Sequence, residues 1–239
     1  MAKERTLKGK TALVTGGSRG IGLAIAHTLG ELGANVSICA RDAHRLERAV
    51  SELKARGIST LGIHADVTLA ADVELLVQKT QTSLGPIEIV INNAGTGYFG
   101  PVQASTEAVW DSVLDTNLKG VFLLTKAVAP GMIERRGGHI INIASLAGKN
   151  SFAGGAIYCA SKWGLLGFTH SAAEDLRAYG IRVSAVCPGS VATEFGPHTG
   201  KDVNKMLKAE DVAHAVEMLV TQAPQSFVSE ISMRPTQKP

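Results

Sequence analysis

The chain has 239 residues, of which 45% are hydrophobic and 19% charged, which is enough apolar side chain for one compact domain over residues 1–239. The formal net charge is +3, from 24 basic and 21 acidic residues without a dense basic block, which argues against a nucleic-acid partner. No apolar run reaches the roughly 18 residues of a membrane span, and the charged N-terminus lacks the apolar segment of a secretion signal. We therefore expect a cytoplasmic protein that does not enter a membrane.

Short runs rich in β-branched residues alternate with longer segments of helical period along the chain. Six strands are predicted in this way, at Thr11–Thr15, Val36–Ala40, Ser59–His64, Glu88–Ile91, His139–Ile143 and Arg182–Val186. A weaker signal predicts a seventh, edge strand at Phe227–Met233. Such alternation gives a parallel sheet covered by helices on both faces. The prediction is a Rossmann-type, doubly wound α/β fold of about seven strands.

The helices between these strands are bounded by glycines. Periodic segments at Ile21–Leu32, Ala43–Arg56 and Ala70–Leu84 repeat their apolar positions every three or four residues, and they are followed by Gly33, Gly57 and Gly85, respectively. No linker, charge run or repeat divides the chain, so a second domain is not expected. The three cysteines and seven histidines show no metal-ligand spacing, and no metal is expected.

A glycine-rich turn, Thr15-Gly16-Gly17-Ser18-Arg19-Gly20-Ile21-Gly22, directly follows the first strand. Glycines let a backbone approach a pyrophosphate, and the following helix offers free N–H groups and a positive dipole end. The spacing of Gly16, Gly20 and Gly22 differs from G-x-G-x-x-G, and by itself it is weak evidence, because such glycines also occur in purely structural turns.

The end of the second strand bears on the choice of dinucleotide. An NAD enzyme would place a carboxylate there for the ribose hydroxyls, whereas this chain has Ala40 followed by Arg41. A guanidinium suits a 2′-phosphate, and Arg19 could reach the same group from the glycine turn, so NADP(H) is the predicted cofactor. Two alternatives stay open: Asp42 could take the ribose role, and both arginines could be solvated surface charges.

The strongest catalytic signal is Tyr158-Cys-Ala-Ser-Lys162, preceded by Ser145 and Asn117. A tyrosine and a lysine four residues apart share one helix face, so the ammonium is expected close to the phenol. That charge should lower the pKa of Tyr158 from about 10 toward neutrality and make it an acid/base group. Each residue alone could equally be an ordinary helix, loop or cap residue.

The glycine turn, Asn92-Asn93-Ala94-Gly95 after the fourth strand and the Tyr158/Lys162 pair together resemble the short-chain dehydrogenase/reductase family over nearly the whole chain. The resemblance implies that Tyr158 is the acid/base, that Ser145 binds the substrate oxygen, that Lys162 holds the nicotinamide ribose and that Asn117 positions a water. Together with the arginine argument, it implies the following cofactor-binding set: Gly16, Ser18, Arg19, Gly20, Ile21, Gly22, Arg41, Asp66, Val67, Asn93, Ala94, Gly95, Tyr158, Lys162, Pro188, Gly189, Val191 and Thr193.

Two parts of this set could have a purely structural role instead. Asp66, expected at the adenine, could cap a helix, and Pro188-Gly189 could be a plain turn before Thr193. Residues 194–208 are expected to form a short substrate lid, with mobility suggested by Gly196-Pro197-His198 and Gly200. Candidate pocket-wall residues are Tyr98, Ala147, Phe152 and Phe195.

Much of the chain is similar to 3-oxoacyl-[acyl-carrier-protein] reductases, but its ending, Ile231-Ser-Met-Arg-Pro-Thr236, is closer to carbonyl and hydroxy-acid reductases of broad specificity. The expected activity is hydride transfer between NADPH and a small-molecule carbonyl or alcohol, of the ketone or 3-oxoacyl type. An NAD-dependent alcohol or sugar dehydrogenase and a non-catalytic NADP-sensing regulatory protein are the alternatives. The resemblance also implies a homodimer or homotetramer, through helices that include Asp111–Arg135 and Tyr158–Tyr179.

Overall fold

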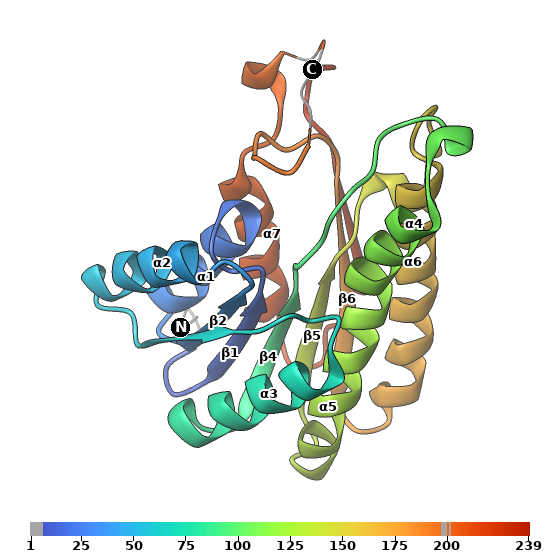
Figure 1. Ribbon diagram of the computed structural model, residues 1–239. Helices are drawn as coiled ribbons and strands as arrows, with labels where there is room; N and C mark the ends of the chain where they lie inside the picture. The colour runs from blue at the N-terminus through green and yellow to red at the C-terminus, as the bar shows by residue number, and fades with distance from the viewer. Residues whose placement is uncertain (1–6, 197–199, 201) are drawn as a thin grey trace.

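A seven-stranded parallel sheet forms the centre of the computed structural model, which describes residues 7–196, 200 and 202–239 (Figure 1). Its order is β3-β2-β1-β4-β5-β6-β7. The strands are β1 (Thr11–Thr15), β2 (Asn35–Ala40), β3 (Thr60–His64), β4 (Ile87–Asn92), β5 (Gly138–Ile143), β6 (Ile181–Pro188) and β7 (Glu230–Met233). The predicted fold class is confirmed.

Helices cover both faces of the sheet (Figure 1). Their bounds are α1 (Gly20–Glu31), α2 (Ala43–Ala55), α3 (Ala70–Leu84), α4 (Glu107–Leu114), α5 (Gly120–Glu134), α6 (Ala156–Arg177) and α7 (Ala209–Val220). One core cluster joins the sheet to α1, α2 and α7, and a second joins it to α3, α5 and α6. Successive side chains of β1 alternate between them, since Ala12 and Val14 belong to the first and Leu13 to the second. Such two-sided burial explains why the strands are mostly apolar on both faces.

Most predicted boundaries lie within two residues of the observed ones. Gly33, Gly57 and Gly85 adopt φ values of +95°, +77° and +95°, the positive φ expected after a helix. The predicted seventh strand was too long, because β7 begins at Glu230 rather than Phe227. Just before β7, the backbone of Val228 is hydrogen-bonded to side chains rather than to a neighbouring strand: its N–H donates to Gln222 Oε1, and its carbonyl oxygen accepts from Ser184 Oγ.

The segment expected as one helix over Asp111–Arg135 is interrupted. A π-type turn, η2 (Asp115–Lys119), separates α4 from α5 and contains Asn117. Such turns are rare and frequently lie at functional sites. Three short 3₁₀ turns complete the structure: η1 (Val102–Ala104), η3 (Leu146–Gly148) and η4 (Val203–Lys205).

The chain reverses its direction of winding between β1 and β4. After β1 it runs outward through β2 and β3, and it then returns to place β4 on the other side of β1. Loops at the carboxyl ends of such neighbouring strands diverge and leave a crevice, which is where ligands bind in open α/β sheets. No helix in the described ranges is long and apolar enough to cross a bilayer.

Candidate active site

The glycine turn and the loop after β4 are joined by hydrogen bonds at the switch point. Asn93 Nδ2 donates to the carbonyl oxygens of Thr15 (2.9 Å) and Gly16 (3.2 Å), and Thr15 Oγ1 accepts from the backbone N–H groups of Asn93 and Ala94 at 3.0 Å each. Gly16 and Gly20 have φ values of +63° and +53°. A side chain would strain these positions, so the glycines are needed for the turn itself.

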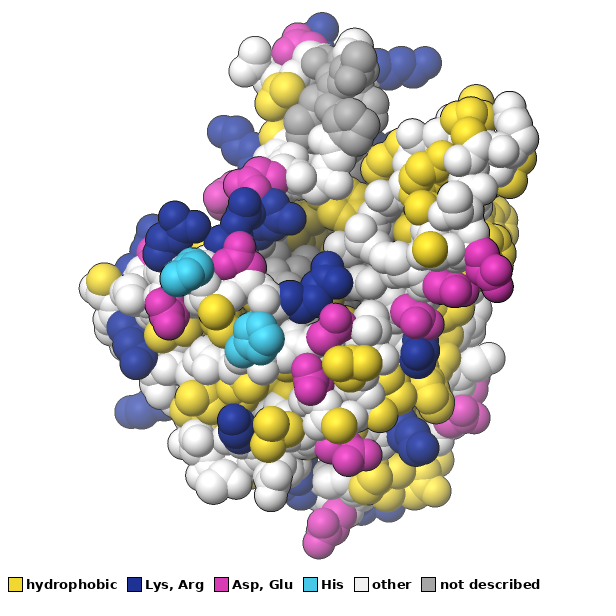
Figure 2. Space-filling model, viewed as in Figure 1, with side chains coloured by type: hydrophobic (Ala, Val, Ile, Leu, Met, Phe, Trp, Pro, Cys, Tyr) yellow, Lys and Arg dark blue, Asp and Glu magenta, His cyan; other side chains and the backbone are white. Residues whose placement is uncertain are grey.

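A cleft of about 1330 Å³ opens above this turn. In Figure 2 it is a hollow whose left rim carries Lys and Arg side chains interspersed with Asp and Glu. Among the residues predicted to bind the cofactor, those lining the cleft are Gly16, Ser18, Arg19, Gly20, Ile21, Arg41, Asp66, Val67, Asn93, Ala94, Gly95, Tyr158, Lys162, Pro188, Gly189, Val191 and Thr193.

Gly22 and Asn117 are predicted site residues that do not line the cleft. Gly22 lies beneath the turn, where a Cβ would collide with the Gly16 carbonyl oxygen and the Asn93 side-chain amide, so a glycine is needed for α1 to pack closely against the turn. Asn117 is buried; its Oδ1 accepts from Thr96 N at 2.8 Å, and its Nδ2 donates to Thr96 O (2.8 Å) and Ser161 Oγ (3.0 Å). These bonds connect the Asn117 side chain to the loop after β4 and to α6, and its expected contact with a water stays a prediction.

Tyr158, Lys162 and Ser145 converge at the carboxyl end of β5. Tyr158 stands in the first turn of α6 and Lys162 one turn later, with its Nζ 5.9 Å from the centre of the tyrosine ring. Lys162 Nζ donates to the carbonyl oxygen of Ile143, the last residue of β5, at 2.9 Å. Ser145, just beyond that strand, accepts from Ala147 N at 3.0 Å and lies near enough to the phenol to favour its ionised form. The end of one strand and the start of one helix thus bring the three groups together.

The electrostatics of this group differ from the sequence-based expectation. Burial raises the pKa of Tyr158 to about 12, although the hydrogen bond with Ser145 acts in the opposite direction. Burial also lowers the pKa of Lys162 to about 8. The expected lowering of the Tyr158 pKa is therefore not found for the protein alone, because desolvation disfavours the phenolate more than its neighbours favour it.

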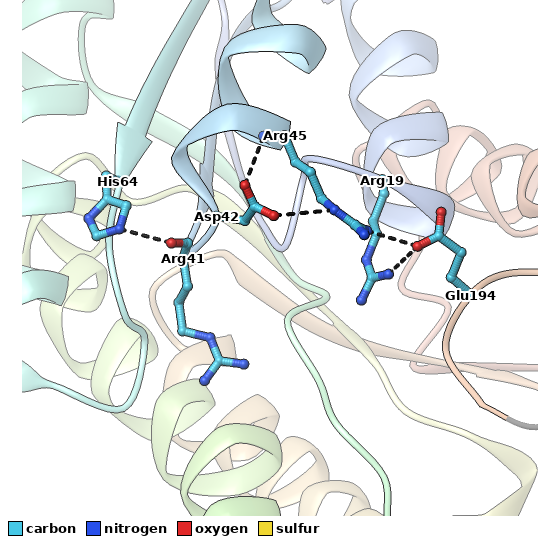
Figure 3. A network of polar contacts seen from close by, with 6 residues as sticks. All are labelled: Arg19, Arg41, Asp42, Arg45, His64 and Glu194. Atoms are coloured by element: carbon cyan, nitrogen blue, oxygen red, sulfur yellow. Dashed lines mark hydrogen bonds and ion pairs between the residues drawn. The ribbon is translucent and has the colours of Figure 1, made fainter.

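The basic residues beside the cleft come from α2 and the loops around it. The second strand ends at Ala40, as predicted, and Asp42 caps α2, with its Oδ1 accepting from Arg45 N at 3.0 Å (Figure 3). The alternative in which Asp42 holds a ribose is thereby disfavoured, since its carboxylate serves the helix and the Arg45 guanidinium. The Arg41 guanidinium extends away from this pair in Figure 3 and approaches Asp66 at 3.9 Å.

Asp66 lies in the turn before α3 and at the wall of the cleft, and its contact with adenine stays a prediction. Its Oδ1 accepts from Thr68 N (2.9 Å) and Thr68 Oγ1 (2.8 Å), a turn that leads into α3. The same residue lines the cleft.

Three phenylalanines stand near Tyr158. Phe99 and Phe195 lie with ring centres 5.4 and 5.9 Å from the tyrosine ring, and Phe152 stacks on Phe99 at 6.3 Å. All three are between 40% and 48% exposed and line the cleft. Ala147 also lines it, whereas the predicted wall residue Tyr98 does not; its neighbour Phe99 takes that place.

The segment predicted as a lid is anchored at its two ends. Ala192 N donates to Leu207 O at 2.8 Å, and Leu207 N donates to Ser190 O at 3.0 Å. Residues 197–199 and 201, on which part of the predicted mobility rests, lie outside the described residues. Among the described residues, no group of three His, Cys, Asp or Glu side chains is placed to hold a metal ion.

The model of the family described as short chain dehydrogenase matches residues 10–204, which include the glycine turn and the Tyr158/Lys162 pair. The chain belongs to the short chain dehydrogenase family.

Relatives within this short chain dehydrogenase family bear different names. The chain is 40% identical to 3-oxoacyl-[acyl-carrier-protein] reductase FabG of Staphylococcus aureus, over 78% of this chain and 76% of that protein. It is 41% identical to dehydrogenase/reductase SDR family member 4 of Oryctolagus cuniculus, over 82% and 76%. A metagenomic short-chain oxidoreductase solved in complex with NADP is 43% identical, with a TM-score of 0.86 over 97% of this chain and 99% of that one.

Two residues of this short chain dehydrogenase, Glu194 in the wall of the cleft and Arg45 beside it, were not singled out from the sequence. Arg45, in the first turn of α2, and Glu194, after β6, meet at the rim of the cleft, with Arg45 Nη1 2.8 Å from Glu194 Oε2. They are 149 residues apart in the chain, and no sequence spacing signals such a contact.

Proposed function

We propose that the protein is an NADP(H)-dependent carbonyl reductase in which Tyr158 is the general acid. The observation that carries the proposal is the convergence of Tyr158, Ser145 and Lys162 at the end of β5, inside the cleft that the glycine turn borders. Reduction of a carbonyl needs a proton donor at the oxygen and a hydride donor at the carbon. A side chain can supply the proton, whereas the hydride comes from the cofactor.

The cleft fits a dinucleotide. Its glycine turn presents the N-terminus of α1, where backbone N–H groups favour a pyrophosphate. Arg19 and Arg41 line the cleft on the side where a ribose 2′-phosphate would carry negative charge. The similarity to an oxidoreductase solved with NADP supports the same choice. When bound, the nicotinamide would supply the hydride.

The raised pKa suits Tyr158 to reduction. With a pKa of about 12 the phenol keeps its proton at neutral pH, so it is ready to donate to a carbonyl oxygen that becomes negative. Ser145 contacts the phenol and could donate to the same oxygen. Stabilisation of this oxyanion type usually contributes about a hundredfold or more in rate.

The pH dependence of reduction should reflect Lys162. Its pKa is about 8, so the ammonium is present below that pH and lost above it. The ammonium lies one turn from Tyr158, where it would stabilise the phenolate left after proton transfer. We expect kcat/KM for ketone reduction to be level at lower pH and to decline as the pH rises through about 8. Initial rates with NADPH in buffers of constant ionic strength measure this, and a profile that stays level to pH 10 would contradict it.

The substrate end of the cleft is apolar and aromatic. Phe99, Phe152 and Phe195 suit a ketone with a hydrophobic substituent, and the named reductase among the relatives acts on a 3-oxoacyl group. A panel of aryl ketones, aliphatic ketones and 3-oxoacyl thioesters, each with NADPH and NADH, tests the proposal through cofactor absorbance. NADPH oxidation with at least one class supports it; the absence of turnover across the panel would refute it.

We further propose that the protein acts in the cytoplasm as a homodimer or homotetramer. Trp110 on α4, Phe122 on α5 and Trp163 on α6 are 48%, 45% and 54% exposed, and large apolar side chains on neighbouring helices favour association. Light scattering coupled to gel filtration should give two or four times the 25.0 kDa chain mass. A monomeric mass at micromolar concentration would contradict this.

A further inference from the structure

Two guanidinium groups converge on one carboxylate oxygen at the rim of the cleft (Figure 3). Arg19 Nη1 and Arg45 Nη1 both donate to Glu194 Oε2, the second at 2.8 Å. The three residues come from the glycine turn, the first turn of α2 and the segment after β6. They join parts of the chain that are far apart in sequence, around the region where the adenosine half of a dinucleotide would lie.

Arg45 is oriented before any ligand arrives. Asp42 binds its guanidinium through Nε at 3.2 Å and its backbone N–H at 3.0 Å, which directs Nη1 toward Glu194. Hydrogen bonds from Arg45 and Arg19 hold the pKa of the Glu194 carboxyl below its usual range, so this group stays ionised. The ionised carboxylate of Glu194 therefore faces the guanidinium groups of Arg19 and Arg45.

This arrangement has little value as a stabilising contact. The side chains of Arg19, Arg45 and Glu194 are 51%, 38% and 65% exposed, and ion pairs in water contribute little to folding. Two guanidinium groups directed at one oxygen are, in contrast, what recognition of a phosphate requires.

We propose that Glu194 is an internal counter-ion occupying the subsite for the ribose 2′-phosphate, and that Arg45 joins Arg19 as a ligand of that phosphate. The inference rests on the proposed NADP(H) preference and extends it: the 2′-phosphate has to displace Glu194 before it can pair with the two arginines. Affinity for the phosphorylated cofactor is thus set by competition within the protein, whereas a dinucleotide without the 2′-phosphate leaves the contact intact.

The two residues beside Glu194 lie against both parts of the cleft. Phe195, the next residue, has its ring centre 5.9 Å from that of Tyr158. Thr193, the preceding residue, packs near the glycine turn, since a Cβ at Gly20 would come within 3.5 Å of Thr193 Cγ2. Glu194 therefore lies between the glycine turn and the aromatic wall of the cleft.

The test measures binding by calorimetry, with adenosine 2′,5′-bisphosphate and AMP as probes and with NADPH and NADH as the full cofactors. Glu194→Gln should tighten binding of adenosine 2′,5′-bisphosphate and NADPH about three- to tenfold, as expected when a competing surface ion pair is removed. Arg45→Ala should weaken both about tenfold, and neither change should alter AMP or NADH. Glu47→Gln and Arg48→Ala remove the same charges from exposed positions of α2 and should have no effect.

The double variant Glu194→Gln/Arg45→Ala separates competition from a general charge effect. If Glu194 competes through Arg45, its removal should bring a smaller gain in the Arg45→Ala background than in the wild type. Equal gains in both backgrounds, or wild-type affinity of Glu194→Gln for adenosine 2′,5′-bisphosphate, would overturn the counter-ion inference alone. Wild-type protein that binds the bisphosphate no better than AMP would instead overturn the NADP(H) preference on which it rests. Melting temperatures of all variants establish that they are folded.

Discussion

Replacing Tyr158 by phenylalanine should lower kcat for ketone reduction by about a hundredfold to ten-thousandfold, the usual contribution of a general acid. The phenol is buried, lines the cleft and is the proton donor in the proposed reaction. The phenyl ring keeps the contacts with Phe99 and Phe195, so the cleft should keep its shape. Steady-state rates with saturating NADPH measure the loss.

Cofactor binding provides the control for this variant. Tyr158→Phe should bind NADPH with nearly wild-type affinity by fluorescence titration, because the glycine turn and the arginines are unchanged. Tyr179→Phe, an exposed tyrosine just beyond α6, should keep full activity. If Tyr158→Phe retains a tenth or more of the wild-type rate, the proton comes from another group. If wild type and variant both bind NADPH and neither reduces any carbonyl compound, the protein is a dinucleotide sensor rather than an enzyme.

The features predicted well from the sequence are those governed by local geometry. Alternating strand and helix periods determine the layers, and the positive φ required after α1, α2 and α3 explains Gly33, Gly57 and Gly85. The separation of Tyr158 and Lys162 by one turn follows from helix geometry alone. The loop after β4 was predicted less well, since Tyr98 was named as a wall residue and its neighbour Phe99 lines the cleft instead.

Features that depend on tertiary burial could not be predicted in the same way. The pKa of Tyr158 was expected to fall because its neighbour Lys162 was visible in the sequence, whereas the desolvation that raises it depends on the packing of distant segments. The partners of the Asn117 amide, Thr96 and Ser161, likewise come from a loop and a helix that no sequence spacing connects to it. The water contact expected of Asn117 stays a prediction.

Arg41→Ala should raise the KM for NADPH by about ten- to a hundredfold and change the KM for NADH by less than about twofold, since loss of a hydrogen bond to a charged group has effects of this size. Arg41 lines the cleft directly after β2, and its approach to Asp66 at 3.9 Å is too long to hold the guanidinium firmly, so it is free to turn toward a phosphate. Initial rates over a range of each cofactor, at fixed salt, measure the two constants.

Arg41→Lys and Arg48→Ala make this experiment specific. Lysine keeps the charge without the planar fork, so Arg41→Lys should lie between wild type and Arg41→Ala in its KM for NADPH. Arg48→Ala removes a positive charge from α2, outside the cleft, and should leave both constants unchanged. An equal rise of both constants in Arg41→Ala would mean that Arg41 acts on the whole dinucleotide, or on the conformation of the loop after β2, and not on the 2′-phosphate. Discrimination would then depend on Arg19 and Arg45 alone, which are the two arginines that pair with Glu194.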